Sequence, residues 1–516
     1  MLLKPTGHLA LIQSAASLLF NSAKPARKFR QKLFATYSVE AVYNLAALRF
    51  QVFARKDYAK RVSVSPSCIV VMRPGTPSDE DLIAYVSPKA APRQVEEAAI
   101  AIEPSDYRWI RPSDAATEPL VWTALMWGTP RDLELLKKLR ERPTLARHIA
   151  EGQARSREGI IPGNREKRFP ELVGRRIFTD NRFPPGSPVY LDAHSLPIVD
   201  HPIEAHSKDS TNFAAFATPQ LLIKQGYQNK VGRLQARLVL PTESGGVLCS
   251  QSYVTVTSKP DTLAAACLSY NSKLAIYFLQ LTSGRMAAYR PETTVAELLN
   301  VPLPDEPGDL KGITDHADFD RQMIKAFELK DAEQVLIDDM IDIHVVDFRG
   351  ASERPGLRPT GRVSGDLLEV LESEPVLHAY ARYFTRVLKA GFGAQKGVRA
   401  RIFSQPVNER LPFRMVSFEL AETDSGKPEL LKTRAPDLLV QMQHLANRSR
   451  RASLAGVRSG LVARFYDGSA TAPRIILMKP DATRYWTRSA ALNDADEVCA
   501  DLFALRPPEH PDPRNQ

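Results

Sequence analysis

Leu2–Ile12 reads LLKPTGHLALI, in which a Pro-Thr-Gly turn leads directly into an apolar strand. Downstream, the periodicity predicts a basic amphipathic helix over Ala23–Tyr37 and strands over Val39–Leu45 and Val62–Met72. Three strands with one helix cannot bury both faces of a sheet. Residues 1–75 are therefore predicted to be one part of a larger α/β domain.

This order of strand, Lys/Arg-rich helix and strand resembles the last part of the catalytic domain of N6-adenine DNA methyltransferases, which occur in type I, type IIG and related restriction-modification systems. In that family, a turn like Lys4–Gly7 lies shortly after the Asn-Pro-Pro-Tyr/Phe motif that holds the target adenine. Neither this motif nor the upstream glycine-rich loop for S-adenosylmethionine occurs in the sequence. The resemblance thus implies a partial Rossmann-like sheet, with the cofactor-binding half supplied by a partner polypeptide.

Residues 76–150 are predicted to be mostly helical. Their centre, Trp122–Leu136, reads WTALMWGTPRDLELL, with Thr129 as a candidate N-cap and Pro130 at the first helical position. The two tryptophans suit a hydrophobic core. The whole string is similar to the connector that these methyltransferases place between the catalytic and target-recognition domains.

Residues 151–310 contain the strongest functional signal. After a Gly-, Pro- and Arg-rich stretch that predicts loops and short strands, strands are expected over Phe216–Lys224, Gly232–Val239 and Cys249–Thr257. A helix over Leu263–Leu281, with Asn-Ser at its centre, follows them, and the region closes with Val-Pro-Leu-Pro at 301–304. This succession resembles the target-recognition domain shared by type I specificity subunits and fused methyltransferases.

A recognition domain of this kind needs a rigid sheet that presents polar loops to the major groove, with cations around it for phosphates. Double-stranded DNA is therefore the expected partner. The predicted DNA-binding residues of this region are Lys224, Tyr227, Lys230, Arg233 and Arg285. For each of them singly, an ordinary solvated turn residue is an equally good interpretation, so the prediction depends on the group.

Two clusters of polar residues could in composition suit a metal-binding site or a nuclease site. The first is rich in imidazoles and carboxylates, but its spacing fits no zinc pattern and prolines interrupt it, so a loop is favoured over a metal site: Asp192, His194, Asp200, His201, Glu204 and His206. The second lies in the helical spacer 311–370, where a solvated helix face is favoured over a nuclease site: Asp331, Glu333, Asp338, Asp339 and Asp342. No metal is expected.

Residues 371–516 are predicted to form a separate α+β module of unknown role. A stack of nucleotides on Tyr485 and Trp486 is possible in principle, but burial of both rings under the last helix is favoured. The arginines at positions 448, 450, 451 and 458 are the alternative binding surface if residues 205–310 do not bind DNA.

Composition agrees with an intracellular, multidomain protein. The 516 residues include 69 Lys and Arg against 59 Asp and Glu, a formal net charge of +10, which favours a polyanionic partner. The four cysteines are widely spaced in apolar surroundings, as buried thiols in a reducing cytoplasm would be. The run Leu9–Phe20 resembles a secretory signal only faintly, since polar residues interrupt it, and no stretch is long enough to span a membrane.

The sequence therefore predicts α/β and α+β architecture in five segments: 1–75, 76–150, 151–310, 311–370 and 371–516. The predicted function is DNA recognition, as the C-terminal part or subunit of an adenine-N6 DNA methyltransferase in a restriction-modification or phage-defence system. Alone, the chain is expected to be inactive. The alternatives are a noncatalytic DNA-binding specificity protein and a truncated, inactive methylase.

Overall fold

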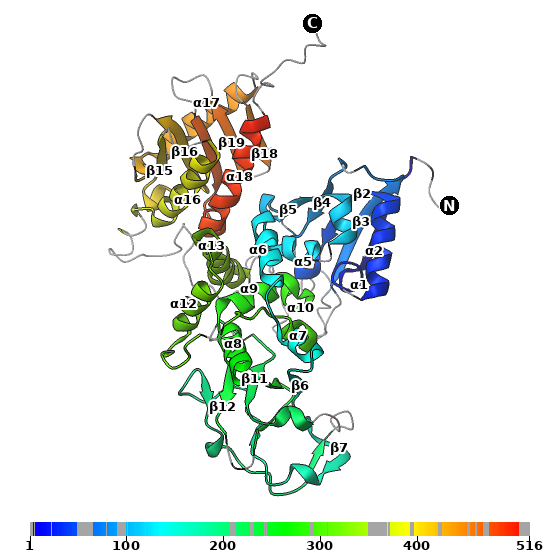
Figure 1. Cartoon of the computed structure of the whole chain (residues 1–516). Coiled ribbons are helices and arrows are strands. Elements are labelled where there is room, and N and C mark those ends of the chain that lie inside the picture. Colours follow the sequence, from blue (N-terminus) through cyan, green and yellow to red (C-terminus); the bar gives the residue numbers. More distant parts are fainter. Residues whose placement is uncertain are drawn as a thin grey trace. The chain divides into compact units, whose positions relative to one another are not determined.

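The structure is a computed structural model of the whole chain (Figure 1). Two compact units make up the chain: unit 1 comprises residues 1–87 and 108–341, and unit 2 comprises residues 88–107 and 342–516. The described residues are all those outside 1–3, 5, 22, 49–65, 79, 90–99, 101, 119, 206–212, 228–231, 242, 244, 289–292, 307, 349–368, 370–371, 393–396, 422–425, 451–454, 460–461, 468–473 and 505–516.

Unit 1 begins with a five-stranded sheet in the order β1-β3-β2-β4-β5. The strands β1 and β2 both run antiparallel to β3, and β2 runs parallel to β4. The bounds of these strands are β1 Leu9–Ser14, β2 Tyr37–Asn44, β3 Ser67–Pro74, β4 Ile83–Val86 and β5 Tyr107–Ile110. The predicted strand at 62–72 is seen from Ser67 onward, since residues 62–65 lie outside the described part.

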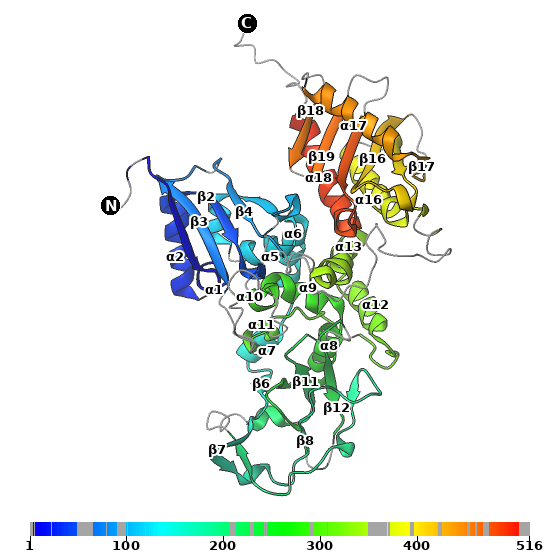
Figure 2. The same ribbon diagram turned by 180° about the vertical axis from the view of Figure 1, so that it is seen from behind.

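Helices cover one face of this sheet (Figure 2). The helix α1 (Ala15–Leu18) packs against β1 and β3, α2 (Lys24–Thr36) packs against β2, and α4 (Pro112–Thr117) packs against α2. The ring of Phe34 on α2 stacks on Trp122, with 5.1 Å between ring centroids. The other face of the sheet is only half-buried, and Ile12 on β1 is 71% exposed.

The connector consists of α5 (Val121–Trp127), α6 (Pro130–Arg140) and α7 (Leu145–Ala150). Both predicted core tryptophans are buried, and the Trp127 Nε1–H donates to the carbonyl of Ala287 at 2.9 Å. Thr129 and Asp132 form the capping box of α6, and Asp132 also accepts a hydrogen bond from the hydroxyl of Tyr277 at 2.7 Å. The connector is thereby fastened to the helices that follow the second sheet.

The second sheet of unit 1 lies within residues 151–310 and has the order β6-β14-β11-β12-β9. The pairs around β11 and β14 are antiparallel, whereas β12 and β9 are parallel. The bounds are β6 Arg155–Glu158, β9 Tyr190–Leu191, β11 Gln220–Lys224, β12 Ala236–Val239 and β14 Tyr253–Thr257. The three expected strands are thus present but shorter, because Phe213–Phe216 forms a 3-10 turn and Leu248–Cys249 belongs to another pair.

Two further strand pairs flank this sheet. The long strand β7 (Pro162–Phe169) pairs antiparallel with β10 (Ile203–Ala205), and β8 (Ile177–Phe178) pairs parallel with β13 (Leu248–Cys249). Aromatic and aliphatic side chains between the strands form a core that includes Phe178, Phe216 and Tyr253.

The predicted helix over 263–281 is two helices, α8 (Pro260–Tyr270) and α9 (Lys273–Thr282). The break is at Asn271, whose buried side chain leaves the helix to bond the backbone of β12. Its Oδ1 accepts from Ala236 N–H at 3.1 Å, and its Nδ2 donates to the carbonyls of Ala236 and Cys267, both at 2.8 Å. This single amide joins the second sheet to the helices beneath it.

The remaining helices of unit 1 are α10 (Gly284–Ala287), α11 (Val295–Leu299), α12 (His316–Ala326) and α13 (Asp331–Asp339). After α13, a π-helical turn at Met340–His344 leads to α14 (Val345–Phe348).

Unit 2 contains a six-stranded sheet in the order β17-β15-β16-β20-β19-β18, antiparallel except for the pair β15 and β17. Phe384 on α16 stacks on Phe418 of β16, while Leu438 on α17 packs with Met415 from the opposite face. The bounds are α16 Pro375–Phe392, β15 Gly397–Ser404, β16 Phe413–Ala421, β17 Glu429–Lys432, α17 Ala435–Arg450, β18 Ala455–Ser459, β19 Val462–Asp467, β20 Arg474–Pro480 and α18 Arg488–Ala504.

The protein is therefore a mixed α/β multidomain protein with several mixed sheets. The first sheet is mostly antiparallel between neighbours, so its derivation from a Rossmann-like methyltransferase sheet stays a prediction. The five predicted segments also stay a division by sequence: unit 1 combines parts of the first four, and residues 88–107 join unit 2.

Candidate nucleic-acid interface

Arg233, a predicted DNA contact, is instead engaged within unit 1. The residue is 8% exposed, and its two Nη atoms donate to both carboxylate oxygens of Asp320, at 2.6 and 2.5 Å. Asp320 in turn accepts the Lys273 N–H, so the pair fixes the start of α9 beside α12. The exposed position expected for Arg233 is wrong, because a bidentate partner lies 87 residues downstream.

Lys224 and Tyr227 are also buried, at 9% exposure each. The Nζ of Lys224 lies 4.5 Å from the centroid of the Tyr253 ring, an intramolecular cation–π contact. The expectation that these two side chains face solvent is therefore wrong as well. They support the sheet, and as described they present neither charge nor ring to a ligand.

Three more cations in or near the second sheet contact aromatic rings. Arg157 lies 5.0 Å from the rings of both Phe213 and Phe216, Arg175 covers Phe216, and Arg237 covers Phe183. Burial lowers the pKa of Arg175 and of Arg237. These guanidinium groups cap the aromatic core.

The last two predicted residues differ. Arg285, on α10, is exposed. Lys230 lies outside the described residues. The four predicted residues that the structure describes do not form one exposed surface, and the role of the five in DNA binding is untested.

A basic stretch that sequence reasoning did not single out lies in β6 and β7. Residues 155–168, RSREGIIPGNREKR, contain five Lys or Arg and two Glu. Arg155 and Arg168 are exposed, as is Arg182 in the following loop. The local charge density is visible in the sequence, which predicts loops and short strands here, and the structure has the strands β6 and β7 at this place.

The path between β6 and β7 is held tightly. A Cβ on Gly159 would lie 2.1 Å from the Ser250 carbonyl oxygen, so only glycine fits there. Ile160 then exchanges backbone hydrogen bonds with Cys249 and Gln251. The chain consequently has a fixed path from β6, at the edge of the second sheet, to β7.

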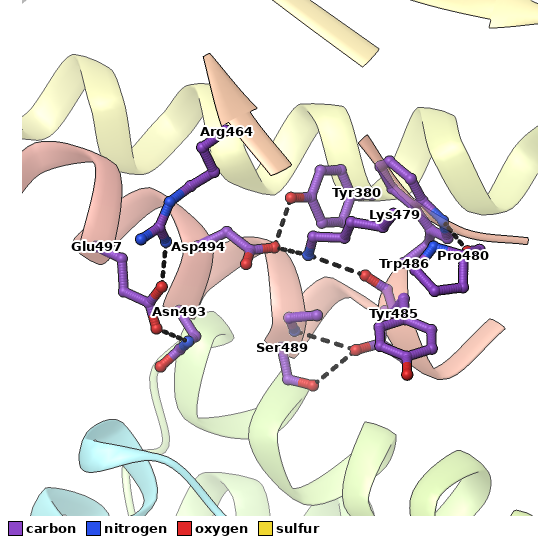
Figure 3. A network of polar contacts seen from close by, with 12 residues as sticks. Tyr380, Arg464, Lys479, Pro480, Tyr485, Trp486, Ser489, Asn493, Asp494 and Glu497 are labelled. Carbon is purple, nitrogen blue, oxygen red and sulfur yellow. Dashed lines mark hydrogen bonds and ion pairs between the residues drawn. The ribbon is translucent and has the colours of Figure 1, made fainter. Parts of the chain in front are cut away.

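In unit 2, the predicted burial of Tyr485 and Trp486 is confirmed (Figure 3). Lys479 Nζ bonds the Tyr485 carbonyl at 3.1 Å and contacts Asp494, which also accepts from the Tyr380 hydroxyl at 2.5 Å. Trp486 Nε1–H donates to the Pro480 carbonyl at 2.9 Å. This network fixes the start of α18 to the sheet, so neither ring is available for base stacking.

The carboxylates considered for metal binding have structural partners instead. Glu333 caps α13 and pairs with Lys138, and Asp338 pairs with Lys273 at 2.9 Å. Within the described residues, no group of three or more His, Cys, Asp or Glu is arranged to hold a metal ion. His206 lies outside them. The side chains of the alternative arginine cluster, at 448, 450, 451 and 458, also lie outside the described part.

Three of the cysteines are buried and none of the four forms a disulfide; Cys499 is half-buried. Burial raises the pKa of the Cys68, Cys249 and Cys267 thiols to about 12. In the described part of the chain, no helix combines the length and the apolar character that crossing a bilayer requires.

No family model matches this chain, and no curated protein matches it significantly. Among solved structures, the type IIG restriction endonuclease BpuSI aligns over 67% of this chain and 48% of its own, at 11% identity and a TM-score of 0.25. A chain of a type I restriction-modification system aligns over 67% of this chain and 98% of its own, at 13% identity and a TM-score of 0.15.

Both neighbours are restriction-modification proteins, and this chain spans about half the length of BpuSI. TM-scores this low carry no argument about shared architecture or activity.

Proposed function

We propose that residues 151–310 recognise double-stranded DNA, as the target-recognition part of an S-adenosylmethionine-dependent adenine-N6 DNA methyltransferase in a restriction-modification or phage-defence system. The observation that carries the proposal is a five-stranded sheet joined to two helices, with the basic strand β6 at its edge and the basic strand β7 directly after it. In a domain of this kind, cationic side chains contact the phosphates and fix the position of the protein on the duplex.

We assign different roles to the buried and the exposed cations. Lys224, Arg233 and Arg237 hold the sheet through aromatic and carboxylate contacts. The exposed cations are the proposed contacts to phosphates and base edges: Arg155, Arg168, Arg182 and Arg285. Lys230 stays in the proposed set by sequence alone.

The residues of this chain do not fit a cofactor or adenine site. The sequence has no Asn-Pro-Pro motif, and the Lys4–Gly7 turn that the resemblance places after it presents exposed Lys4 and Thr6. We therefore derive no step of methyl transfer from this chain. A partner polypeptide is proposed to bind S-adenosylmethionine and the flipped adenine.

The half-buried apolar face of the first sheet favours this partner-dependent enzyme over an autonomous specificity protein. Ile12 is 71% exposed on β1, and Tyr43, Ile69 and Val71 on the same sheet are only partly buried. Apolar strand faces of this kind are normally covered by another layer. Co-expression with the product of the neighbouring upstream reading frame, followed by a methylation assay on duplex DNA, tests this part of the proposal.

DNA recognition is tested with the full chain and a pool of random duplexes. Binding is measured against salt for wild type and for alanine variants of Arg155, Arg168, Arg182 and Arg285, with Arg321→Ala on α12 as the exposed control. Loss of one phosphate contact lowers the slope of log affinity against log salt by about 0.9, whereas loss of a base contact changes the selected sequence. Unchanged affinity, slope and selected site in all four variants contradict the proposal.

A further inference from the structure

The charged residues of the helix α2, which packs on the first sheet, are all positively charged. Its sequence, KPARKFRQKLFAT, has five cations and no carboxylate. Four of these cations are exposed: Lys24, Arg27, Lys28 and Lys32. Three of them, at 24, 28 and 32, follow each other at i, i+4 spacing, about 6 Å apart along the helix axis.

Buried contacts fix the rotation of α2 about its axis, so these charged side chains stay on its exposed face. Leu33 and Phe34 are buried against the sheet and Trp122. The fifth cation, Arg30, is 2% exposed, and its Nη1 donates to the carbonyls of Leu18 and Asn21 at 2.9 and 2.7 Å. The apolar face and Arg30 thus fix the exposed cations outward.

Neighbouring elements do not neutralise the exposed cations. Of the carboxylates on elements packed near α2, Glu40 on β2 pairs with His8 and Arg73, and Asp114 on α4 is exposed. Across the described residues, Lys24, Arg27, Lys28 and Lys32 form no ion pair within 4 Å. The surface of α2 therefore has an uncompensated positive charge.

The charge is also placed against the intrinsic preference of a helix. Cations near a helix N-terminus oppose the helix dipole, and α2 has Lys24 at its first position, no acidic residue in its first turn and no basic residue in its last. A local arrangement that lowers helix stability indicates a function for those residues.

We propose that α2 binds the sugar-phosphate backbone of a nucleic-acid duplex, as a second phosphate-contact surface outside residues 151–310. An anionic membrane is the less favoured ligand, because a helix that lies on a bilayer inserts its apolar face, and the apolar face of α2 is buried in the protein. Phe29, at 52% exposure, is the one large apolar side chain exposed on this helix. Contacts of this kind add affinity for any sequence.

The test is a triple variant of the full chain, Lys24→Gln, Lys28→Gln and Lys32→Gln. Glutamine and lysine have similar helix propensity, so α2 is retained, and circular dichroism and the thermal midpoint check this. The control is Lys137→Gln, Lys311→Gln and Lys325→Gln, which removes the same charge from exposed positions elsewhere in unit 1. The probe is a labelled duplex of about 30 base pairs with random sequence, titrated from about 50 to 200 mM salt.

The triple variant is expected to lose about 2 to 3 units of the salt slope, from 0.9 per phosphate contact, and at least tenfold in affinity at about 100 mM salt. The control variant is expected to bind as wild type does. Equal slopes for the two triple variants overturn the proposal. So does a loss of binding to anionic lipid vesicles with an unchanged slope on the duplex.

The inference and the proposed function fail separately. If the triple variant loses affinity while Arg155, Arg168, Arg182 and Arg285 variants do not, α2 is a binding surface and the recognition assignment is wrong. If the triple variant binds normally while those arginine variants lose their selected site, recognition stands and the inference for α2 is wrong.

Discussion

Replacing Asn271 by alanine removes a side chain that joins the second sheet of unit 1 to the helices α8 and α9. Asn271 is 1% exposed, and its amide makes three hydrogen bonds to backbone groups, two of them to Ala236 on β12. Each buried hydrogen bond contributes about 1 kcal/mol, and the backbone groups it leaves behind are shielded from water. The expected loss is about 3 kcal/mol in the free energy that holds β12 closed.

Hydrogen exchange followed by mass spectrometry measures this loss where it occurs. Peptides that cover β12, Ala236–Val239, are expected to exchange roughly a hundredfold faster in Asn271→Ala, since each 1.4 kcal/mol is tenfold. The matched control is Asn300→Ala, an exposed asparagine with one hydrogen bond to the Ala296 carbonyl. Acceleration of β12 below about fivefold, or equal acceleration in the control, would refute the reasoning.

Three further predictions concern other parts of the chain. Arg233→Ala leaves Asp320 without its bidentate partner and should lower the stability of unit 1 by about 1 to 3 kcal/mol in urea unfolding, with the salt slope for DNA unchanged; a reduced slope would reassign Arg233 to the interface. The raised pKa of Cys249 and Cys267, about 12, means that only the unfolded state ionises as pH rises above 9. Stability is therefore full below pH 9 and should fall between pH 9 and 12, an effect that serine replacement of both thiols should reduce in a pH series of urea midpoints. Calorimetry of the chain alone with S-adenosylmethionine should show no binding, and micromolar affinity would contradict the partner-dependent proposal.

Element positions were predictable where a local pattern determines them. The amphipathic helix α2 and the burial of Trp122 follow from local patterns, and the structure has α2 near its predicted bounds and Trp122 buried. The Asn-Ser step inside the predicted 263–281 helix was visible too. That it ends one helix depends on β12, which lies more than 30 residues upstream.

The predicted DNA contacts were less reliable because charge alone does not indicate exposure. Lys224 is the last residue of a predicted strand, yet its Nζ lies over the ring of Tyr253, and Arg233 similarly pairs with Asp320. Partners 29 and 87 residues away leave no local signal. The basic strands β6 and β7 lie in a stretch for which the sequence predicts loops and short strands, but its charge density was not singled out as a binding surface.

Residues 88–107 belong to unit 2 although unit 1 surrounds them in sequence. Within unit 2, Glu103 contacts Arg484 and Lys89 pairs with Asp106 at 3.4 Å. During synthesis this segment leaves the ribosome more than 230 residues before position 342, a wait of roughly 10 to 50 s at 5 to 20 residues per second. The nascent chain must therefore fold unit 1 around an unfinished insertion, and a gene cut after Ile341 would deliver unit 1 with an orphaned piece of unit 2 still attached.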